Sequence, residues 1–172
     1  TGLTVNGNLS VDGGTIKLDG NYPTGTENVA LGDTALDSVI TGGNYNTAIG
    51  ALAGTAITTG DENTLVGSRS GDAITTGSSN TAVGQASLGT NITGNYNTAI
   101  GVSSLSLNTA SFNTAVGYQS LANNIANSNT AFGYQAGLSN TTGGSNVILG
   151  YQAMLDNTTG GGNISIGTET LF

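Results

Sequence analysis

A short motif that recurs about every seventeen residues constrains the fold of this chain more than any other feature. Each copy begins with Asn, continues with two middle residues and a large apolar residue, and ends with Gly; residues 46–50 read Asn-Thr-Ala-Ile-Gly. The asparagines of the nine copies are Asn28, Asn46, Asn63, Asn80, Asn97, Asn113, Asn129, Asn146 and Asn163. The glycines are Gly32, Gly50, Gly67, Gly84, Gly101, Gly117, Gly133, Gly150 and Gly167. Such regularity is the signature of a repeat protein.

The length of the period decides the class of repeat. The glycines follow one another at steps of 16 to 18 residues, and polar turns such as residues 58–60, Thr-Thr-Gly, separate the copies. This length suits two short strands and two turns, whereas Gly, Thr and Asn at this density oppose a helix. The sequence therefore predicts an all-β, parallel β-solenoid or β-roll of about nine coils of 16–18 residues, forming one domain over residues 24–172.

Alternation of side chains along the motif predicts two different faces. We expect the bulky column, which includes Ile49, Val83 and Val116, to lie inside the coil. The small residues, mostly Ala and Gly, then form a smooth strip on the opposite face, of the kind that a closely approaching backbone requires. This strip predicts that copies of the chain pack together as a parallel homotrimer. The alternative is a monomer in which Ala and Gly fill a tight turn.

The repeated asparagines have a structural interpretation. An Asn stacked on the Asn of the next coil can bond amide to amide along the stack. Asn also tolerates the left-handed backbone conformation expected at a corner. We therefore expect the asparagine and glycine columns to be structural positions and not ligand sites.

Residues 1–23 follow a different rule. The β-type triplets 3–5, 9–11 and 16–18 alternate with Gly-containing turns, and Pro23 precedes the repeats. Three-residue strands are too short for an independent sheet. We predict that this segment is a short-strand fibre or stalk region that wraps with partner chains. The chain does not begin with Met, and we expect it to be part of a longer protein.

Composition excludes several classes of function. The 172 residues contain no His and no Cys, only two Lys or Arg, and ten Asp or Glu, which gives a net charge of −8. Without His or Cys there is no Ser–His or Cys–His nucleophile pair and no His/Cys zinc site. Two basic residues cannot neutralise a row of phosphates, so we expect no nucleic-acid partner. No apolar run is long enough for membrane insertion.

Carboxylates are the remaining candidates for chemistry. We expect Asp61-Glu62 and Asp72 to lie on neighbouring coils, in polar turns beside Arg69. Paired carboxylates can cleave glycosidic bonds, but this setting favours a solvated face with an ion pair. The Gly-rich nonapeptide of calcium-binding β-rolls is absent. We expect no enzyme activity, no metal and no cofactor.

Three tyrosines form the one candidate binding site. Tyr118, Tyr134 and Tyr151 occupy the same place in three consecutive repeats, and each is followed by Gln. An aromatic ladder flanked by amides can hold sugar rings. The alternative is that the rings stack across coils and stiffen the surface.

The repeats resemble those of phage tail fibres. Residues 113–121 read Asn-Thr-Ala-Val-Gly-Tyr-Gln-Ser-Leu, residues 129–137 are nearly the same, and residues 3–18 also look like tail-fibre sequence. The Asn-x-Ala-Ile-Gly core is similar to the heads of trimeric autotransporter adhesins, which are trimeric β-rolls with a shorter period. The resemblance implies a structural and adhesive module of a trimeric tail fibre, either shaft or receptor-contacting segment, located in the virion.

The resemblance also implies partners. These are sister copies, other tail proteins of the virion, and a glycan or lipopolysaccharide of the host surface; for an adhesin head, the location is the bacterial outer surface. The negative net charge means that recognition of an anionic host surface cannot rely on long-range attraction. An ice-binding solenoid is a further alternative, because residues 57–60 and 74–77 repeat Ile-Thr-Thr-Gly in register, although this pattern is lost in the middle repeats.

Overall fold

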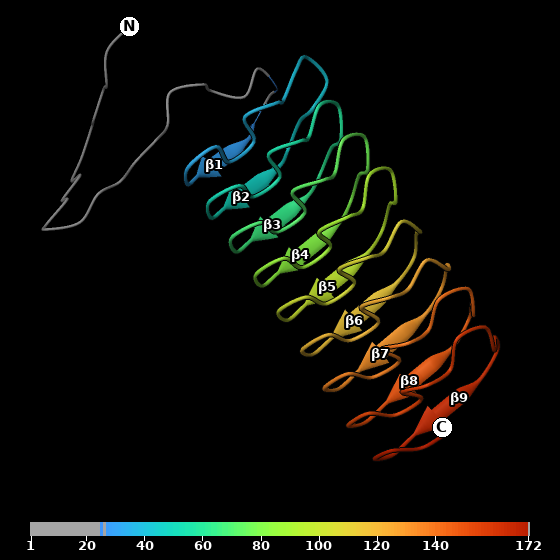
Figure 1. The fold of residues 1–172 in the computed structure, drawn as a ribbon. Coiled ribbons are helices and arrows are strands. Elements are labelled where there is room, and N and C mark those ends of the chain that lie inside the picture. Colours follow the sequence, from blue (N-terminus) through green and yellow to red (C-terminus); the bar gives the residue numbers. More distant parts are fainter. Residues whose placement is uncertain (1–24, 26, 172) are drawn as a thin grey trace, which may run out of the picture.

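The chain winds into a solenoid whose strands stack one above another. A computed structural model describes residue 25 and residues 27–171. Figure 1 shows the coils following one another along one axis. The predicted fibre or stalk segment, residues 1–23, lies outside the described residues.

Each repeat contributes one three-residue strand. The strands are β1 (Val29–Leu31), β2 (Thr47–Ile49), β3 (Thr64–Val66), β4 (Thr81–Val83), β5 (Thr98–Ile100), β6 (Thr114–Val116), β7 (Thr130–Phe132), β8 (Val147–Leu149) and β9 (Ile164–Ile166). We name each coil after the strand that it contains. Every strand consists of the three residues between the motif Asn and the motif Gly, so the repeated motif and the strands coincide.

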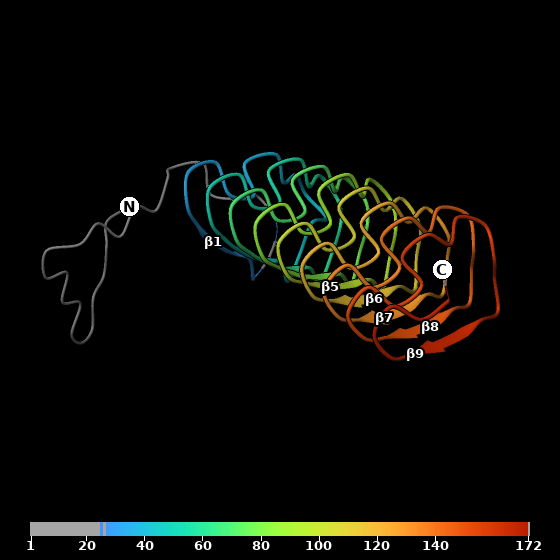
Figure 2. The same ribbon diagram turned by 60° about the horizontal axis from the view of Figure 1, so that its bottom comes forward.

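The strands form one parallel sheet in sequence order, from β1 to β9. Equivalent residues are paired throughout: Thr64 lies opposite Thr81, and Val66 lies opposite Val83. Figure 2 shows the strands along one side of the solenoid. The predicted all-β parallel solenoid, with repeats stacked in register, is therefore confirmed. At about 4.8 Å for each step, nine strands extend about 40 Å along the axis.

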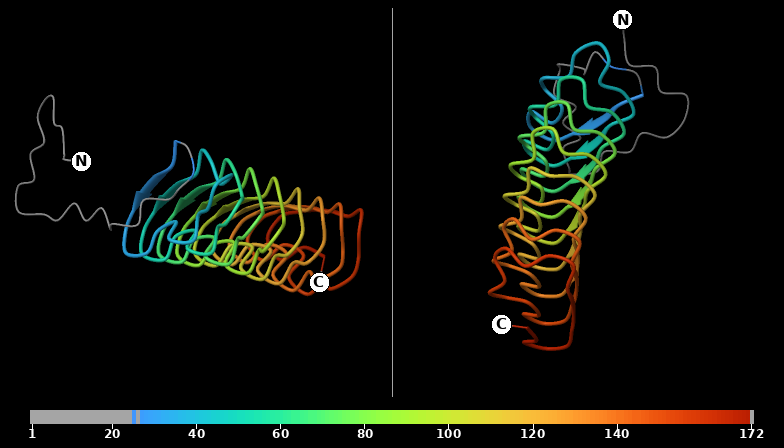
Figure 3. Two further views of the ribbon diagram at one scale, coloured as in Figure 1. Left: turned by 90° about the horizontal axis from the view of Figure 1, so that it is seen from above. Right: turned by 90° about the vertical axis from the view of Figure 1, so that its right-hand side faces the viewer.

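The second half of each coil differs from the expected second strand. It consists of turns, although these turns also bond from coil to coil. The Leu88 N–H donates to the Ser104 carbonyl at 2.9 Å, and the Leu105 N–H donates to the Ser120 carbonyl at 3.0 Å. Both walls of the solenoid are thus hydrogen-bonded along the axis, and the two views of Figure 3 show how regularly the turns repeat.

The predicted orientation of the strands is wrong. The small middle residue of each strand points inward: Ala48, Ala82 and Ala115 are fully buried. The bulky column faces outward, because Ile49 is 38% exposed and Val83 and Val116 are partly exposed. The physical reason is that the facing turns already fill the narrow interior with large side chains.

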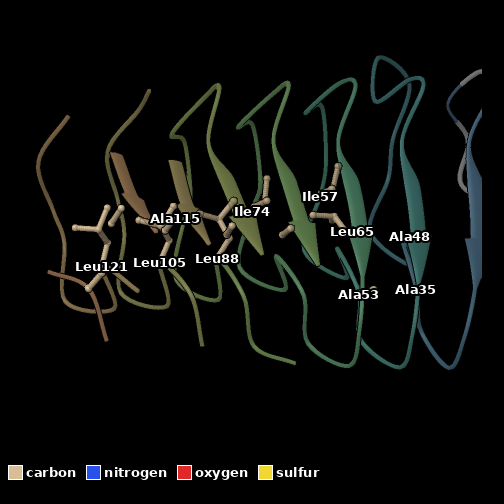
Figure 4. Packing of buried hydrophobic residues seen from close by; sticks show 14 of the residues in the cluster. Ala35, Ala48, Ala53, Ile57, Leu65, Ile74, Leu88, Leu105, Ala115 and Leu121 are labelled. Carbon is tan, nitrogen blue, oxygen red and sulfur yellow. The ribbon is translucent and has the colours of Figure 1, made fainter. Parts of the chain in front are cut away.

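Packing across the interior matches large residues with small ones. Figure 4 shows Leu88, Leu105 and Leu121 directed from the turns toward the strands. Where a strand carries the larger Leu65, the nearby turns carry Gly54 and Gly71 instead. A Cβ on either glycine would come within 2.8 Å of a Leu65 methyl group. The core therefore keeps its volume while the residues that fill it change from coil to coil.

The motif glycines are required by the next coil and not by a sister chain. Gly50 has a φ of +135°, and a Cβ placed on it would lie 2.6 Å from the carbonyl carbon of Gly67. The glycine column was correctly taken as a place of close backbone approach. The approaching backbone belongs to the same chain, however, so the predicted Ala and Gly strip for contact between copies does not exist.

Candidate functional site

The asparagine column forms an amide ladder inside the solenoid. Asn63 Nδ2 donates to Asn46 Oδ1 at 2.9 Å, the Asn63 N–H donates to the same oxygen at 3.0 Å, and Nδ2 also donates to the Gly77 carbonyl at 3.0 Å. The same arrangement recurs at Asn80 and Asn97. From Asn46 to Asn146 all members of the column are buried. They hold coils and turns together and are inaccessible to a ligand.

A second asparagine ladder escaped the sequence analysis. Its members are Asn91, Asn108, Asn124, Asn140 and Asn157. The amide of Asn124 donates to Asn108 Oδ1 at 3.1 Å and accepts from Asn140 Nδ2 at 2.8 Å. The signal in the sequence is an Asn five or six residues before the motif Asn, in five consecutive copies.

The three candidate tyrosines stack on one another. The ring centroids of Tyr118 and Tyr134 are 5.3 Å apart with an interplanar angle of 14°, and those of Tyr134 and Tyr151 are 5.3 Å apart at 10°. Each ring remains 43–48% exposed. Because Tyr134 has a ring neighbour on both faces, a sugar ring cannot stack on it. Along the rest of the ladder, ring edges and hydroxyl groups are available.

Amides accompany the tyrosines. Gln135 Nε2 donates to Gln119 Oε1 at 2.9 Å, and Gln152 Nε2 donates to Gln135 Oε1 at 2.9 Å. A further aromatic pair, not identified from sequence, joins Tyr96 and Phe112 at 5.3 Å and 10°. Aromatic rings thus stack from coil to coil at two separate places on the solenoid.

The outer face of the sheet is a regular surface that runs along all nine strands. We define the outer sheet face by two columns of side chains, from the first and third residue of each strand. The first column is Val29, Thr47, Thr64, Thr81, Thr98, Thr114, Thr130, Val147 and Ile164. The third-residue column is Leu31, Ile49, Val66, Val83, Ile100, Val116, Phe132, Leu149 and Ile166. No residue of β1–β9 is charged, so the face combines threonine hydroxyl groups with aliphatic side chains and the ring of Phe132.

The candidate carboxylates have structural partners. Asp61 Oδ1 accepts from the Asn44 N–H at 2.7 Å, and Glu62 Oε2 accepts from Ser79 Oγ at 3.1 Å. Burial raises the pKa of the Asp72 carboxyl, and the positive charge of Arg69 opposes this rise. Within residues 25 and 27–171, no group of three or more His, Cys, Asp or Glu is placed to hold a metal ion.

In the described part of the chain, no helix is long and apolar enough to span a membrane. No family model, curated protein or solved structure matches the chain. The geometry of the ladders and of the outer sheet face is therefore the basis for assigning a function.

Proposed function

We propose that this chain is a structural and adhesive module of a homotrimeric phage tail fibre, serving as shaft or as a segment that contacts the host receptor. The observation that carries the proposal is the uninterrupted stack of nine coils, in register and hydrogen-bonded on both walls. A structure of this kind transmits position and force along an axis. The resemblance of its repeats to tail-fibre repeats supports the same assignment.

The ladders suit a load-bearing rod. Each coil bonds to the next through sheet and turn hydrogen bonds, and from Asn46 to Asn113 the motif asparagines add amide-to-amide contacts. Stability in such arrays is the sum of contacts between neighbours, so the rod can be long without a large core. Among the described residues, the buried side-chain N and O atoms all have a hydrogen-bond partner except Thr34 Oγ1.

Adhesion would depend on short-range contacts. A chain with a net charge of −8 is repelled at long range by an anionic cell surface. The exposed edges of Tyr118, Tyr134 and Tyr151, beside the glutamine amides, are the surface that we assign to a host glycan or lipopolysaccharide. Other tail proteins of the virion are the further partners of the proposed fibre.

The head of a bacterial trimeric adhesin, on the outer surface of the cell, is the alternative within the same class. It shares the Asn-x-Ala-Ile-Gly core and the association of copies. The longer period and the Tyr-Gln pairs of coils β6–β8 favour the tail fibre.

Ice binding is a second candidate because of an observation on the sheet. Six threonines, from Thr47 to Thr130, are in register on the outer sheet face. Two of the turn threonines that suggested this function bond to the next coil: Thr58 Oγ1 donates to the Thr75 carbonyl at 3.1 Å, and Thr75 Oγ1 donates to the Ile92 carbonyl at 3.2 Å. Thermal hysteresis of the purified chain would support ice binding, and its absence would exclude it.

Native mass measurement tests the fibre proposal. We expect particles of three chains, each of 16.9 kDa. A single-chain particle at micromolar concentration would contradict both the fibre and the adhesin assignment. For adhesion, Tyr134→Ala should weaken attachment to host cells, with Tyr96→Ala in the separate aromatic pair as the matched control. Equal attachment by both variants and the parent would remove the glycan site.

A further inference from the structure

Three tyrosines on the surface of coils β6–β8 are held in an arrangement that favours reaction with one another. Tyr118, Tyr134 and Tyr151 lie in consecutive coils, with neighbouring ring centroids 5.3 Å apart and interplanar angles of 14° and 10°. The rings are nearly parallel and occupy equivalent places in the repeat, so the carbon ortho to each hydroxyl group lies beside the corresponding carbon of the next ring. Each residue is 43–48% exposed, which leaves the phenol open to an oxidant and the side chain free to adjust.

We propose that this tyrosine stack is a site of oxidative cross-linking, where a one-electron oxidant converts two neighbouring tyrosines of one chain into a dityrosine. The cross-link joins Tyr134 to Tyr118 or to Tyr151. It depends neither on a glycan contact nor on the number of chains in the particle. Proximity supplies the selectivity, because holding two reactants side by side turns a collision between molecules into a step within one molecule.

The reaction balances with hydrogen peroxide as the oxidant, used by a peroxidase. Two phenols each give up one electron and the hydroxyl proton, which yields two phenoxyl radicals and reduces one peroxide to two waters. The radicals form a C–C bond between their ortho carbons. The proton on each of these carbons then passes through solvent to the oxygen of its own ring, which restores both phenols. The chain has lost two hydrogen atoms in total.

The composition of the chain leaves few competing sites for the radical. The chain contains no Cys, no Trp and no His, and its single methionine, Met154, is fully buried. Among the other tyrosines of the described residues, Tyr45 has glutamates at the equivalent place of both neighbouring coils, and Tyr96 stacks on Phe112, which has no phenol. A radical formed on the stack therefore meets another tyrosine, whereas a radical on Tyr45 or Tyr96 does not.

The product ties neighbouring coils together covalently. A link from Tyr134 to Tyr118 joins coils β6 and β7, and a link from Tyr134 to Tyr151 joins coils β7 and β8. Either link closes a loop of about one coil, and it restricts the unfolded chain as a disulfide closing such a loop does. Oxidation would thus fasten a part of the solenoid that contains no cysteine.

Oxidation of the purified protein with hydrogen peroxide and a peroxidase tests the proposal. Dityrosine fluorescence, denaturing electrophoresis and mass mapping of peptides measure the product, and coupling of N-acetyltyrosine in the same mixture verifies the oxidant. We expect a chain that still migrates as a monomer, is lighter by two hydrogens, and carries a link from position 134 to position 118 or 151. Absence of a link within the chain, while N-acetyltyrosine couples, would overturn the proposal.

Removing the central phenol should abolish the product. Tyr134→Phe keeps an aromatic ring in the stack, but the remaining phenols of Tyr118 and Tyr151 are two coils apart, about 10 Å at the sheet spacing. Tyr96→Phe is the matched control, because it removes one phenol from a stack without a second tyrosine; it should cross-link like the parent. An equal yield in Tyr134→Phe and the parent would overturn the proposal.

The separate aromatic pair allows the site to be moved. Tyr96 and Phe112 have the geometry of the tyrosine stack, at 5.3 Å and 10°, and lack only the second phenol. Combining Phe112→Tyr with Tyr134→Phe should therefore abolish the link at position 134 and create one between positions 96 and 112. If this double variant forms no link between positions 96 and 112, stacking between coils does not direct the coupling, and the proposal is overturned.

Discussion

The first coils and the later coils of the solenoid fill the same interior position with two different kinds of side chain. In coils β1–β3 this position carries Val39, Ile57 and Ile74, which are buried among other apolar side chains. In coils β4–β8 it carries the second asparagine ladder, from Asn91 to Asn157. The backbone winding is the same in both regions. The comparison shows that the side chain at this position must fill the space and, if it is polar, must have hydrogen-bond partners. It does not have to be apolar.

The two solutions have different requirements. An aliphatic residue must fit the volume left by its neighbours, and a Cβ on Gly71 would lie 2.8 Å from both Leu65 and Ile74 methyl groups. An asparagine must find partners for its amide, and Asn140 finds them in Asn124 Oδ1 and the Gly143 carbonyl, both at 2.8 Å. Coils β1–β3, the apolar region, therefore depend on side chains that fit together in volume. Coils β4–β8, the polar region, depend on each amide finding its partners.

The largest expected effect is at the centre of the polar region. Asn124 donates to Asn108 Oδ1 and the Ala126 carbonyl, and accepts from Asn129 and Asn140. Asn124→Ala removes four hydrogen bonds, three of them buried, so the free energy of unfolding should fall by about 4 kcal/mol, at about 1 kcal/mol for each bond. Urea denaturation followed by circular dichroism measures the change. The control is Asn123→Ala, one residue earlier and partly exposed; equal losses in both variants would show that the ladder contributes nothing.

The next effect is a cavity in the apolar region. Leu65 is fully buried and fills the space beside Gly54 and Gly71. Leu65→Ala should lower the free energy of unfolding by about 3 kcal/mol, because neither glycine has a side chain that could fill the gap. The same denaturation experiment measures it. Val66→Ala, on the outer sheet face of the same strand, is the control when it is measured in single chains. A loss at Leu65 no larger than at Val66 would mean that volume matching is unimportant.

A compensating substitution tests whether the side chains at positions 65 and 71 are matched in volume. The backbone does not demand glycine at position 71, because Leu88 adopts a φ of 54° at the same place in the next coil, close to the 57° of Gly71. Combining Leu65→Ala with Gly71→Leu reproduces the Ala82 and Leu88 pattern of coil β4. We expect the double variant to recover about 1–2 kcal/mol of the loss caused by Leu65→Ala. Additive destabilisation in the double-mutant cycle would contradict matched packing between the two positions.

The sequence predicted the architecture because the architecture follows from the period. A 17-residue repeat with Asn and Gly at fixed places allows little except a stacked coil, and the amide contacts from Asn46 to Asn63 follow from stacking alone. The tyrosine stack is predictable for the same reason. Any side chain that recurs at one place in consecutive coils lies beside its counterpart.

The orientation of the strands could not be derived in this way. Alternation shows that Ala48 and Ile49 lie on opposite faces, but it does not show which face is inside. The rule that bulky residues are buried gave the wrong answer, since Leu36 and Leu88 in the turns fill the interior and leave room only for Ala. The pairing of Leu65 with Gly54 and Gly71 was the available signal, because a large strand residue coincides there with missing turn side chains.

The smallest predicted effect concerns Asp72, a charged residue near the interior of the apolar region. Asp72 lies beside Gly71, and the equivalent residues of coils β6–β8 are Ala122, Leu138 and Leu155. Burial raises the pKa of the Asp72 carboxyl above 3.8, with Arg69 opposing the rise. The folded state therefore holds this proton more tightly than the unfolded state. The resulting stabilisation is complete below pH 3.8 and is lost as the pH rises through the folded-state pKa.

Replacing this carboxyl removes a charge that the folded state accommodates poorly at neutral pH. Asp72→Asn should therefore raise the melting temperature slightly at pH 7, and the gain should disappear as the pH falls toward 3.8. Asp37→Asn, at the equivalent exposed place of coil β1, controls for the change in net charge. Thermal unfolding of both variants between pH 3 and pH 7 measures the difference. Parallel curves for Asp72→Asn and the parent would show that desolvation of Asp72 has no effect on stability, and that the two regions differ only in how their interiors are filled.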